Sequence, residues 1–290
     1  MSEAFDVPLR VAPDRYVADE WALVLVTEGL TPSVWRADEG FVLGVPADEA
    51  ERAAAVLEAY DSETWADRQE AEETAGSVHL YAGLAVGGAL LAFFFITGPW
   101  NPVVRWFERG SADASRILGG ELWRTITALT LHADARHVLA NAIAGALVLS
   151  AVCRLLGPGL GSAVVLLAGA GGNLVNALVH GSLHVSVGAS TSVFGAVGVL
   201  VGLGVARRRG RGAPWRRAWV PVAAGLALLA MLGTGPRVDL LAHLFGLLVG
   251  GLLGVVVAFA VPRPPGPRVQ WILGGAALVV IFYSWVLALR

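Results

Sequence analysis

The sequence predicts an all-α polytopic membrane protein that carries a small N-terminal α+β soluble domain. Its 290 residues are 56% hydrophobic with a mean hydropathy of +0.64. Only 15% are charged, against about 25% in a typical soluble domain. Residues 1–75 hold 18 of the 23 acidic residues and five arginines, whereas residues 76–290 hold 16 arginines and five acidic residues. We therefore expect an acidic cytoplasmic domain with a linker over residues 1–75 and a membrane domain over residues 76–290.

The N-terminal domain is expected to be mixed in secondary structure. The pattern predicts a helix over Ala18–Leu30, short strands at Ser33–Arg36 and Phe41–Val45, and an amphipathic helix from Pro46 to about Tyr60. The acidic run Asp67–Glu73 predicts a linker. The domain holds no catalytic constellation, so a solubilising cap is favoured over an interaction or regulatory module, and its partner is unknown.

Seven apolar stretches predict seven transmembrane helices, most near the ~20 residues that cross a bilayer. They run approximately over Val78–Ile96, His137–Leu156, Leu160–Val179, Val185–Val205, Ala218–Gly233, Leu240–Val261 and Gln270–Leu289. The fifth is short and contains Pro221 near its start.

Arginines predict the orientation of these spans. They cluster after the fourth span, at 207–217, and again at Arg263 and Arg268 after the sixth. By the positive-inside rule both links are cytoplasmic, which places the N-terminus inside and Ser190 near the outer face. The outer link Trp100–Arg136 is either a structured loop resting in the interface or an ordinary amphipathic connector. The acidic N-terminus predicts no signal peptide, and the single Cys153 allows no intrachain disulfide.

Ser190 is the candidate nucleophile, in the small-residue stretch that runs from Gly188 to Gly195. Such a stretch alone more often indicates tight helix packing. His137 and Asn141 are spaced i, i+4, which puts both on one helix face. They offer either two donors to an oxyanion or hydrogen bonds between helices.

His243 is the candidate general base, because a serine needs a base to remove its proton. Glycines recur every three or four residues after it and after Ser190, at 246, 250 and 254 and at 195, 198 and 202. Two such faces let helices approach closely, which would bring Ser190 and His243 together. Asp239 lies one turn before His243 but is expected in the outer link, so a dyad is favoured over a triad.

The other polar residues near the apolar stretches are expected to have structural roles. His180 and His184 have a spacing that suits a metal, but no third ligand is evident, so a polar loop is preferred and neither metal nor cofactor is expected. Asn173, Asn176 and His132 are expected to make interhelical or loop hydrogen bonds.

An ordered set of motifs resembles the rhomboid intramembrane serine proteases over about residues 100–260. In chain order the motifs are Glu121-Leu122-Trp123-Arg124, Leu131-His132, His137-x-x-x-Asn141, Gly188-x-Ser190 and Ala242-His243-x-x-Gly246. The resemblance implies a six-helix core plus one C-terminal helix. It implies Ser190 as nucleophile, His243 as base, and an oxyanion site from His137, Asn141 and backbone N–H groups. Trp123-Arg124 would lie in the family's half-submerged first outer loop.

The implied activity is hydrolysis of peptide bonds in or near transmembrane segments of other membrane proteins. The implied location is a bacterial inner (plasma) membrane, with the bilayer and substrate proteins as partners and no nucleic acid. The chain departs from the family pattern at Thr191, where glycine is usual. The alternative is a non-catalytic rhomboid-like protein that binds transmembrane clients. A transporter ranks third, because no charged residue lies deep in the predicted spans.

Overall fold

The structure is a computed structural model that describes residues 6–12, 14–181, 184–210, 222–223, 225–227, 239–261 and 263–290, with the side chains of 62–78 and 207–210 left aside. The chain divides into two compact units, Met1–Thr74 and Ala75–Arg290. The predicted fifth span, Ala218–Gly233, lies outside the described residues apart from 222–223 and 225–227.

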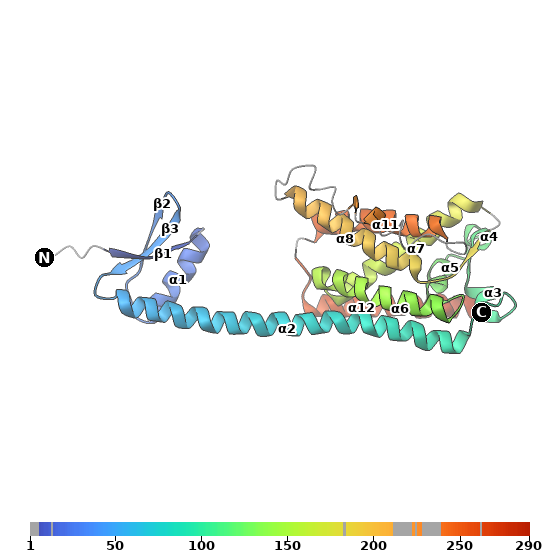
Figure 1. The fold of residues 1–290 in the computed structure, drawn as a ribbon, viewed down its shortest axis with the longest axis horizontal. Coiled ribbons are helices and arrows are strands. Elements are labelled where there is room, and N and C mark those ends of the chain that lie inside the picture. Colours follow the sequence, from blue (N-terminus) through green and yellow to red (C-terminus); the bar gives the residue numbers. More distant parts are fainter. Residues whose placement is uncertain are drawn as a thin grey trace. The chain divides into compact units, whose positions relative to one another are not determined.

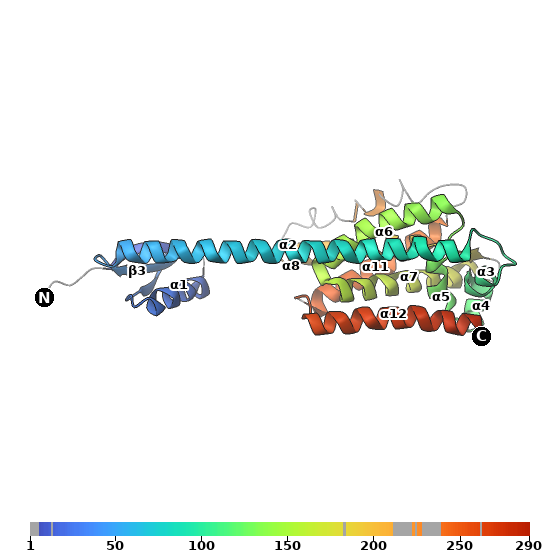
Figure 2. The same cartoon turned by 90° about the horizontal axis from the view of Figure 1, so that it is seen from below.

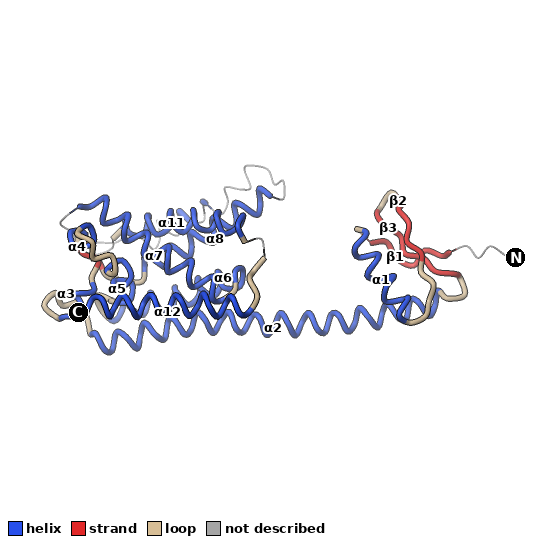
Figure 3. The backbone as a smooth tube through the Cα atoms, turned by 180° about the vertical axis from the view of Figure 1, so that it is seen from behind, coloured by secondary structure: helices blue, strands red, loops and turns tan. Residues whose placement is uncertain are grey.

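The N-terminal unit is a three-stranded antiparallel sheet with helices packed against it (Figure 3). Strands β1 (Asp6–Ala12) and β2 (Ser33–Ala37) flank the central β3 (Gly40–Pro46), and α1 (Arg15–Thr27) follows β1. The core of the unit is made by buried leucine, valine and alanine side chains of α1, the loop after α1, β3 and the first turns of α2: Leu25, Leu30, Leu43, Val45, Ala53 and Leu57. The α+β prediction is confirmed, whereas β1 was not predicted.

The acidic run Asp67–Glu73, which was predicted as a linker, is helical. Helix α2 runs without interruption from Ala50 to Thr97 and includes both Asp67–Glu73 and the first predicted span. Alanine and glutamate dominate the segment, and both residue types favour helix. The high density of charge in this segment therefore does not interrupt the helical backbone.

The second unit is a bundle of apolar helices around α7 and α8 (Figures 1 and 2). After α2, the long helices are α6 (Ala135–Leu156), α7 (Pro158–His180), α8 (Ser190–Gly210), α11 (Leu240–Ala260) and α12 (Pro267–Leu289). Five described helical segments are long and apolar enough to cross a membrane: His79–Thr97, α6, α7, α11 and α12. The apolar part of α8, Ser190–Ala206, is shorter. The chain is therefore a mostly helical, multi-span membrane protein.

Glycine faces set the closest helix contact, between α8 and α11. A Cβ on Gly250 would overlap the carbonyl oxygen of Gly195, and one on Gly198 would overlap that of Leu247. Only glycine allows backbones this near. The predicted approach of the two glycine-bearing helices is confirmed.

The link between α2 and α6 is structured. It contains α3 (Arg105–Gly110), β4 (Ala112–Asp113), α4 (Ala114–Leu118), α5 (Arg124–Thr127) and the 3₁₀ turn η1 (Ala128–Thr130). Strand β4 pairs with β5 (Val185–Ser186), just before α8. Arg124 is 1% exposed and donates to Glu121 Oε2 at 2.6 Å and to the carbonyls of Glu108 and Ser111. The link is therefore an ordered structure, held by hydrogen bonds, and its strand β4 pairs with the residues just before α8.

Candidate active site

The turn before α8 is held by backbone hydrogen bonds. Gly188 has φ +135°, a conformation that side-chain-bearing residues rarely adopt, and its N–H donates to the carbonyl of Ala128 at 2.9 Å. The next N–H, of Ala189, donates to Nε2 of the fully buried His132 at 3.4 Å. Two residues of the preceding link thus fix the backbone that leads into Ser190.

Ser190 is the first residue of α8 and is partly exposed. The first intrahelical bond runs from the N–H of Val193 to the carbonyl of Ala189. The N–H groups of the three residues between them therefore have no helical carbonyl to bind, and the helix dipole adds positive potential there. A partial negative charge beside Ser190 Oγ would be stabilised by these groups.

His137 faces the same turn from the start of α6. Its ring Nδ1 accepts from the N–H of Ala133 at 3.4 Å, so the proton of the neutral ring lies on Nε2. A Cβ built on Gly188 would lie 2.9 Å from this Nε2 and 3.6 Å from Ser190 Oγ. Glycine is needed at 188 both for its φ and to leave room for the imidazole.

Asn141 lies one turn after His137 and is 5% exposed. One hydrogen of its Nδ2 is used by the carbonyl of His137 at 3.0 Å. The second hydrogen of that amide group remains available to a ligand in the cavity described below.

His243 lies in the first turn of α11 and is 6% exposed. Its imidazole stacks on the ring of Phe194, with centroids 4.6 Å apart and planes 28° apart. Phe194 is one helical turn after Ser190. The stack therefore places the His243 ring over the same face of α8 from which Ser190 projects.

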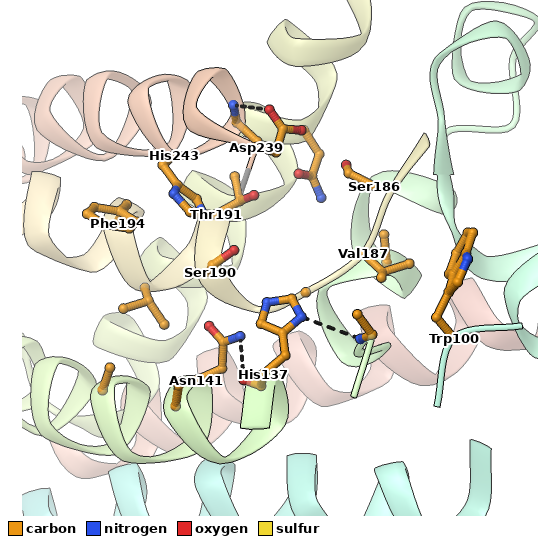
Figure 4. A pocket seen from close by; sticks show the side chains of 18 of the residues that line it. Trp100, His137, Asn141, Ser186, Val187, Ser190, Thr191, Phe194, Asp239 and His243 are labelled. Carbon is orange, nitrogen blue, oxygen red and sulfur yellow. Dashed lines mark hydrogen bonds between the residues drawn. The ribbon is translucent and has the colours of Figure 1, made fainter. Parts of the chain in front are cut away.

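All four predicted site residues line one cavity of about 950 Å³. In Figure 4 the Ser190 side chain lies between the imidazole of His243 and the side chains of His137 and Asn141. Apolar groups supply much of the remaining wall, among them Trp100, Val187 and Phe194. The cavity thus brings together the hydroxyl of Ser190, the imidazoles of His137 and His243 and the carboxamide of Asn141, and its lining also includes charged or polar side chains, among them Asp134, Arg136, His184 and Asp239.

Thr191, the departure from the family pattern, is 3% exposed. Its methyl Cγ2 packs where Gly172 of α7 and Gly246 of α11 meet, within 2.7 and 3.2 Å of the Cβ positions those glycines lack. The methyl thus fills a helix junction, while the residue still contributes to the cavity wall.

Asp239 is the N-cap of α11, where Oδ1 accepts from the N–H of Ala242 at 3.0 Å. Its Oδ2 accepts from Asn176 Nδ2 at 2.8 Å and lies 2.6 Å from His184 Nε2. Burial alone would raise the pKa of this carboxyl, but the three hydrogen bonds together lower it below its usual range. The carboxylate is engaged at the edge of the cavity by groups other than a catalytic side chain.

Sequence reasoning missed two supporting residues. Phe194 is recognisable only through its i, i+4 spacing from Ser190, which puts both on one helix face. His184 was expected in a polar loop without a partner in view, and its partner Asp239 is 55 positions away. The predicted hydrogen-bonding roles of His132, Asn173 and Asn176 are confirmed; Asn173 Nδ2 donates to the carbonyl of Thr125 at 2.9 Å.

Comparison with known proteins identifies the family of the chain. Residues 119–259 match the rhomboid domain family. The Bacillus subtilis (strain 168) protein YdcA, whose name assigns it provisionally to the rhomboid proteases, is 31% identical over 170 residues, which is 59% of this chain and 83% of YdcA. RHOMBOID-like protein 5 of Arabidopsis thaliana is 29% identical over 56% of this chain and 52% of its own length. Rhomboid protease GluP of B. subtilis is 33% identical over 100 residues, 34% of this chain and 19% of GluP. The chain belongs to the rhomboid family.

Proposed function

We propose that the protein is an intramembrane serine endopeptidase that hydrolyses peptide bonds in or near transmembrane segments of membrane proteins. The observation that carries the proposal is the convergence of Ser190, His243 and the His137–Asn141 pair on one cavity at the N-terminus of α8. Family membership supports it, because rhomboid proteases act on transmembrane substrates. We place the chain in a bacterial inner membrane with seven spans and a cytoplasmic N-terminus.

In the proposed mechanism His243 removes the proton of Ser190 Oγ as the oxygen attacks the scissile carbonyl carbon. The carbonyl oxygen becomes an oxyanion. Nε2–H of His137, the second Nδ2–H of Asn141 and the free N–H groups of the first α8 turn are its donors. The His243 imidazolium then protonates the leaving amine as the C–N bond breaks, which leaves an acyl ester on Ser190.

Water completes the cycle. His243 removes a proton from the water as it attacks the ester, and the proton returns to Ser190 Oγ when the C–O bond breaks. The products are a carboxylate and the amine released earlier. Asp239 is not part of this scheme, because its carboxylate is held by Ala242, Asn176 and His184.

Labelling with a fluorophosphonate tests the nucleophile directly, and a panel of single-span reporters in proteoliposomes tests proteolysis. We expect Ser190→Ala and His243→Ala to lose labelling and to cut turnover by several orders of magnitude while folding is kept. Ser192→Ala is the matched control. That hydroxyl is two residues away and faces Gly169 of α7, where a Cβ would overlap it.

The control variant should be labelled and should cleave reporters like the unmodified protein. Cleavage by folded Ser190→Ala protein would refute the dyad. Reporter binding without labelling or cleavage by the unmodified protein would instead support the non-catalytic, client-binding function.

A further inference from the structure

A second cluster of ligating side chains lies at the edge of the cavity and takes no part in the proposed hydrolysis. It consists of His180 at the end of α7, His184 before β5 and Asp239 at the start of α11. We propose that these three residues bind one divalent transition-metal ion, Zn²⁺, which joins the segment after α7 to the start of α11.

The first support is the spacing of the ligand atoms. One imidazole nitrogen of each histidine and one carboxylate oxygen of Asp239 all lie within 4.8 Å of one another. Ligands of a tetrahedral Zn²⁺ with bonds of about 2.0 Å are roughly 3.3 Å apart. The ion would replace the hydrogen bond between His184 Nε2 and Asp239 Oδ2, which lie 2.6 Å apart, and the proton of that bond would be released. The imidazoles of His180 and His184 stack with centroids 4.0 Å apart and planes 15° apart, so both rings would turn to point at one ion. His180 is exposed and the His184 and Asp239 side chains are 25% and 17% exposed, which leaves room for these rotations.

The second support is the set of hydrogen bonds behind the ligands. His180 Nδ1 lies 3.2 Å from the carbonyl of Asn176, so the ring donates there and keeps a lone pair on Nε2. Oδ1 of Asp239 is occupied by the N–H of Ala242, which leaves Oδ2 to bind the ion. Metal-binding histidines and carboxylates are characteristically oriented by such outer partners.

The third support is a buried oxygen acceptor next to the cluster. Asn176 is 2% exposed and its carboxamide contacts Asp239 through Nδ2. Its Oδ1 is buried and has no hydrogen-bond partner within the part of the chain that is described. A carbonyl oxygen without a donor costs free energy when buried. The same amide group contacts Asp239 through Nδ2, so this unpartnered acceptor belongs to a side chain that already touches the cluster.

The donor set selects the ion. Two imidazoles and one carboxylate suit Zn²⁺, whereas Mg²⁺ and Ca²⁺ prefer all-oxygen sites. The partial exposure of the cluster leaves room for a water molecule as a further ligand.

The bound ion would act on the start of α11. Asp239 caps this helix, and the N–H of His243 donates to the carbonyl of Asp239 at 3.2 Å. Fixing Asp239 to His180 and His184 therefore fixes the helical turn that carries His243. The proposal does not depend on proteolysis, and it is tested in the Ser190→Ala protein.

The experiment measures Zn²⁺ binding to the full-length chain in detergent, with a purification tag that contains no histidine. Competition with a chromogenic chelator gives affinity, and elemental analysis gives stoichiometry. We expect one Zn²⁺ per chain, a rise in Tm with Zn²⁺ and no rise with Mg²⁺ at the same concentration. His180→Ala, His184→Ala and Asp239→Asn should each weaken binding tenfold or more. Asn at 239 keeps an oxygen to cap α11.

His79→Ala is the matched control, because it removes a histidine from α2 far from the cluster in sequence, and it should bind Zn²⁺ within twofold of the parent. An absence of Zn²⁺ binding would overturn the proposal. So would unchanged binding by the His180→Ala/His184→Ala double variant, which would assign the ion to His137 and His243. His180 is exposed, so the result for His180→Ala decides the matter if Asp239→Asn fails to fold.

Discussion

Thr191 stands where the family usually has glycine, and substitutions there show whether threonine affects turnover. Its methyl group packs against Gly172 and Gly246, where α7 and α11 meet. We therefore expect Thr191→Gly to keep reporter turnover within about tenfold, a barrier change near 1.4 kcal/mol. Stability should fall by about 2 kcal/mol, from the lost methyl and the added backbone freedom.

Thr191→Ser separates the loss of the methyl group from the gain in backbone freedom, since it removes only the methyl. Its free energy of unfolding, measured by chemical denaturation, should fall by about 1 kcal/mol. A much larger rise in turnover for Thr191→Gly would show that the threonine restrains the site.

His132 makes the turn before Ser190 sensitive to acid. Burial, with a smaller contribution from His137, lowers the pKa of His132 from 6.5 to about 4. Between these two values the unfolded chain binds more protons than the folded one. The associated stability is complete above pH 6.5 and is lost as the pH falls towards 4, by about 3 kcal/mol.

Protonation of Nε2 would also end its acceptance of the Ala189 N–H. We expect the free energy of unfolding to fall between pH 7 and pH 5 more steeply in the parent than in His132→Gln, which cannot titrate. Equal pH slopes would mean that His132 is already accessible to protons in the folded chain.

At the scale of elements, the distance between α8 and α11 decides whether Ser190 and His243 meet. Gly250 contacts the backbone of Gly195, where any Cβ would overlap a carbonyl oxygen. Gly250→Ala should push α11 outward and lower turnover by about 100-fold or more, since a displacement near 1 Å has an effect of that order. Reporter cleavage and Tm both measure the change.

Gly275→Ala on α12 is the matched control. A Cβ there meets nothing within 4 Å. The Gly275→Ala variant should have unchanged turnover. Its free energy of unfolding should rise by about 0.5–1 kcal/mol, because alanine has less backbone freedom than glycine in the unfolded chain. If Gly250→Ala behaves like Gly275→Ala, the glycine contact does not set the position of His243.

The elements that could be predicted are those whose signal is local. Hydropathy over about 20 residues located α6, α7, α11 and α12 to within a few residues. Strand β1 was missed because Pro8 and two charged residues weaken its pattern, and its strand character comes from pairing with β3. The continuity of α2 was not predicted, because the acidic run was assigned to a linker without a secondary structure, although glutamate and alanine favour helix.

At the scale of the molecule, the predicted site residues converge because the three motifs that carry them lie at the starts of α6, α8 and α11, which line one cavity. The spacing of glycines after Ser190 and His243 indicated which helices pack together. No local pattern could indicate that Asp239 meets His180 and His184, because this depends on the placement of α7 and α11 side by side. Such contacts between residues far apart in sequence could not be predicted from the sequence.

The last prediction concerns the N-terminal unit, Met1–Thr74, which we propose is dispensable for chemistry. Its described ion pairs, Arg10–Asp61 and Arg15–Asp19, and the hydrogen bond from Tyr60 to Glu20 are internal to it. Every candidate catalytic residue lies beyond residue 130.

The span His79–Thr97 contacts α6 within the second unit, where Gly83 and Gly87 lie against the backbone of residues 142–146. A chain that begins at Ala75 keeps this contact. We expect it to cleave the reporter panel in detergent within about threefold of the full-length rate, because the loss of remote contacts should change the activation barrier by less than about 1 kcal/mol. Fluorophosphonate labelling of Ser190 and the Tm of the shortened chain are measured together with cleavage. A shortened chain that unfolds at the parent's temperature yet is neither labelled nor active would show that residues 1–74 help to form the active conformation.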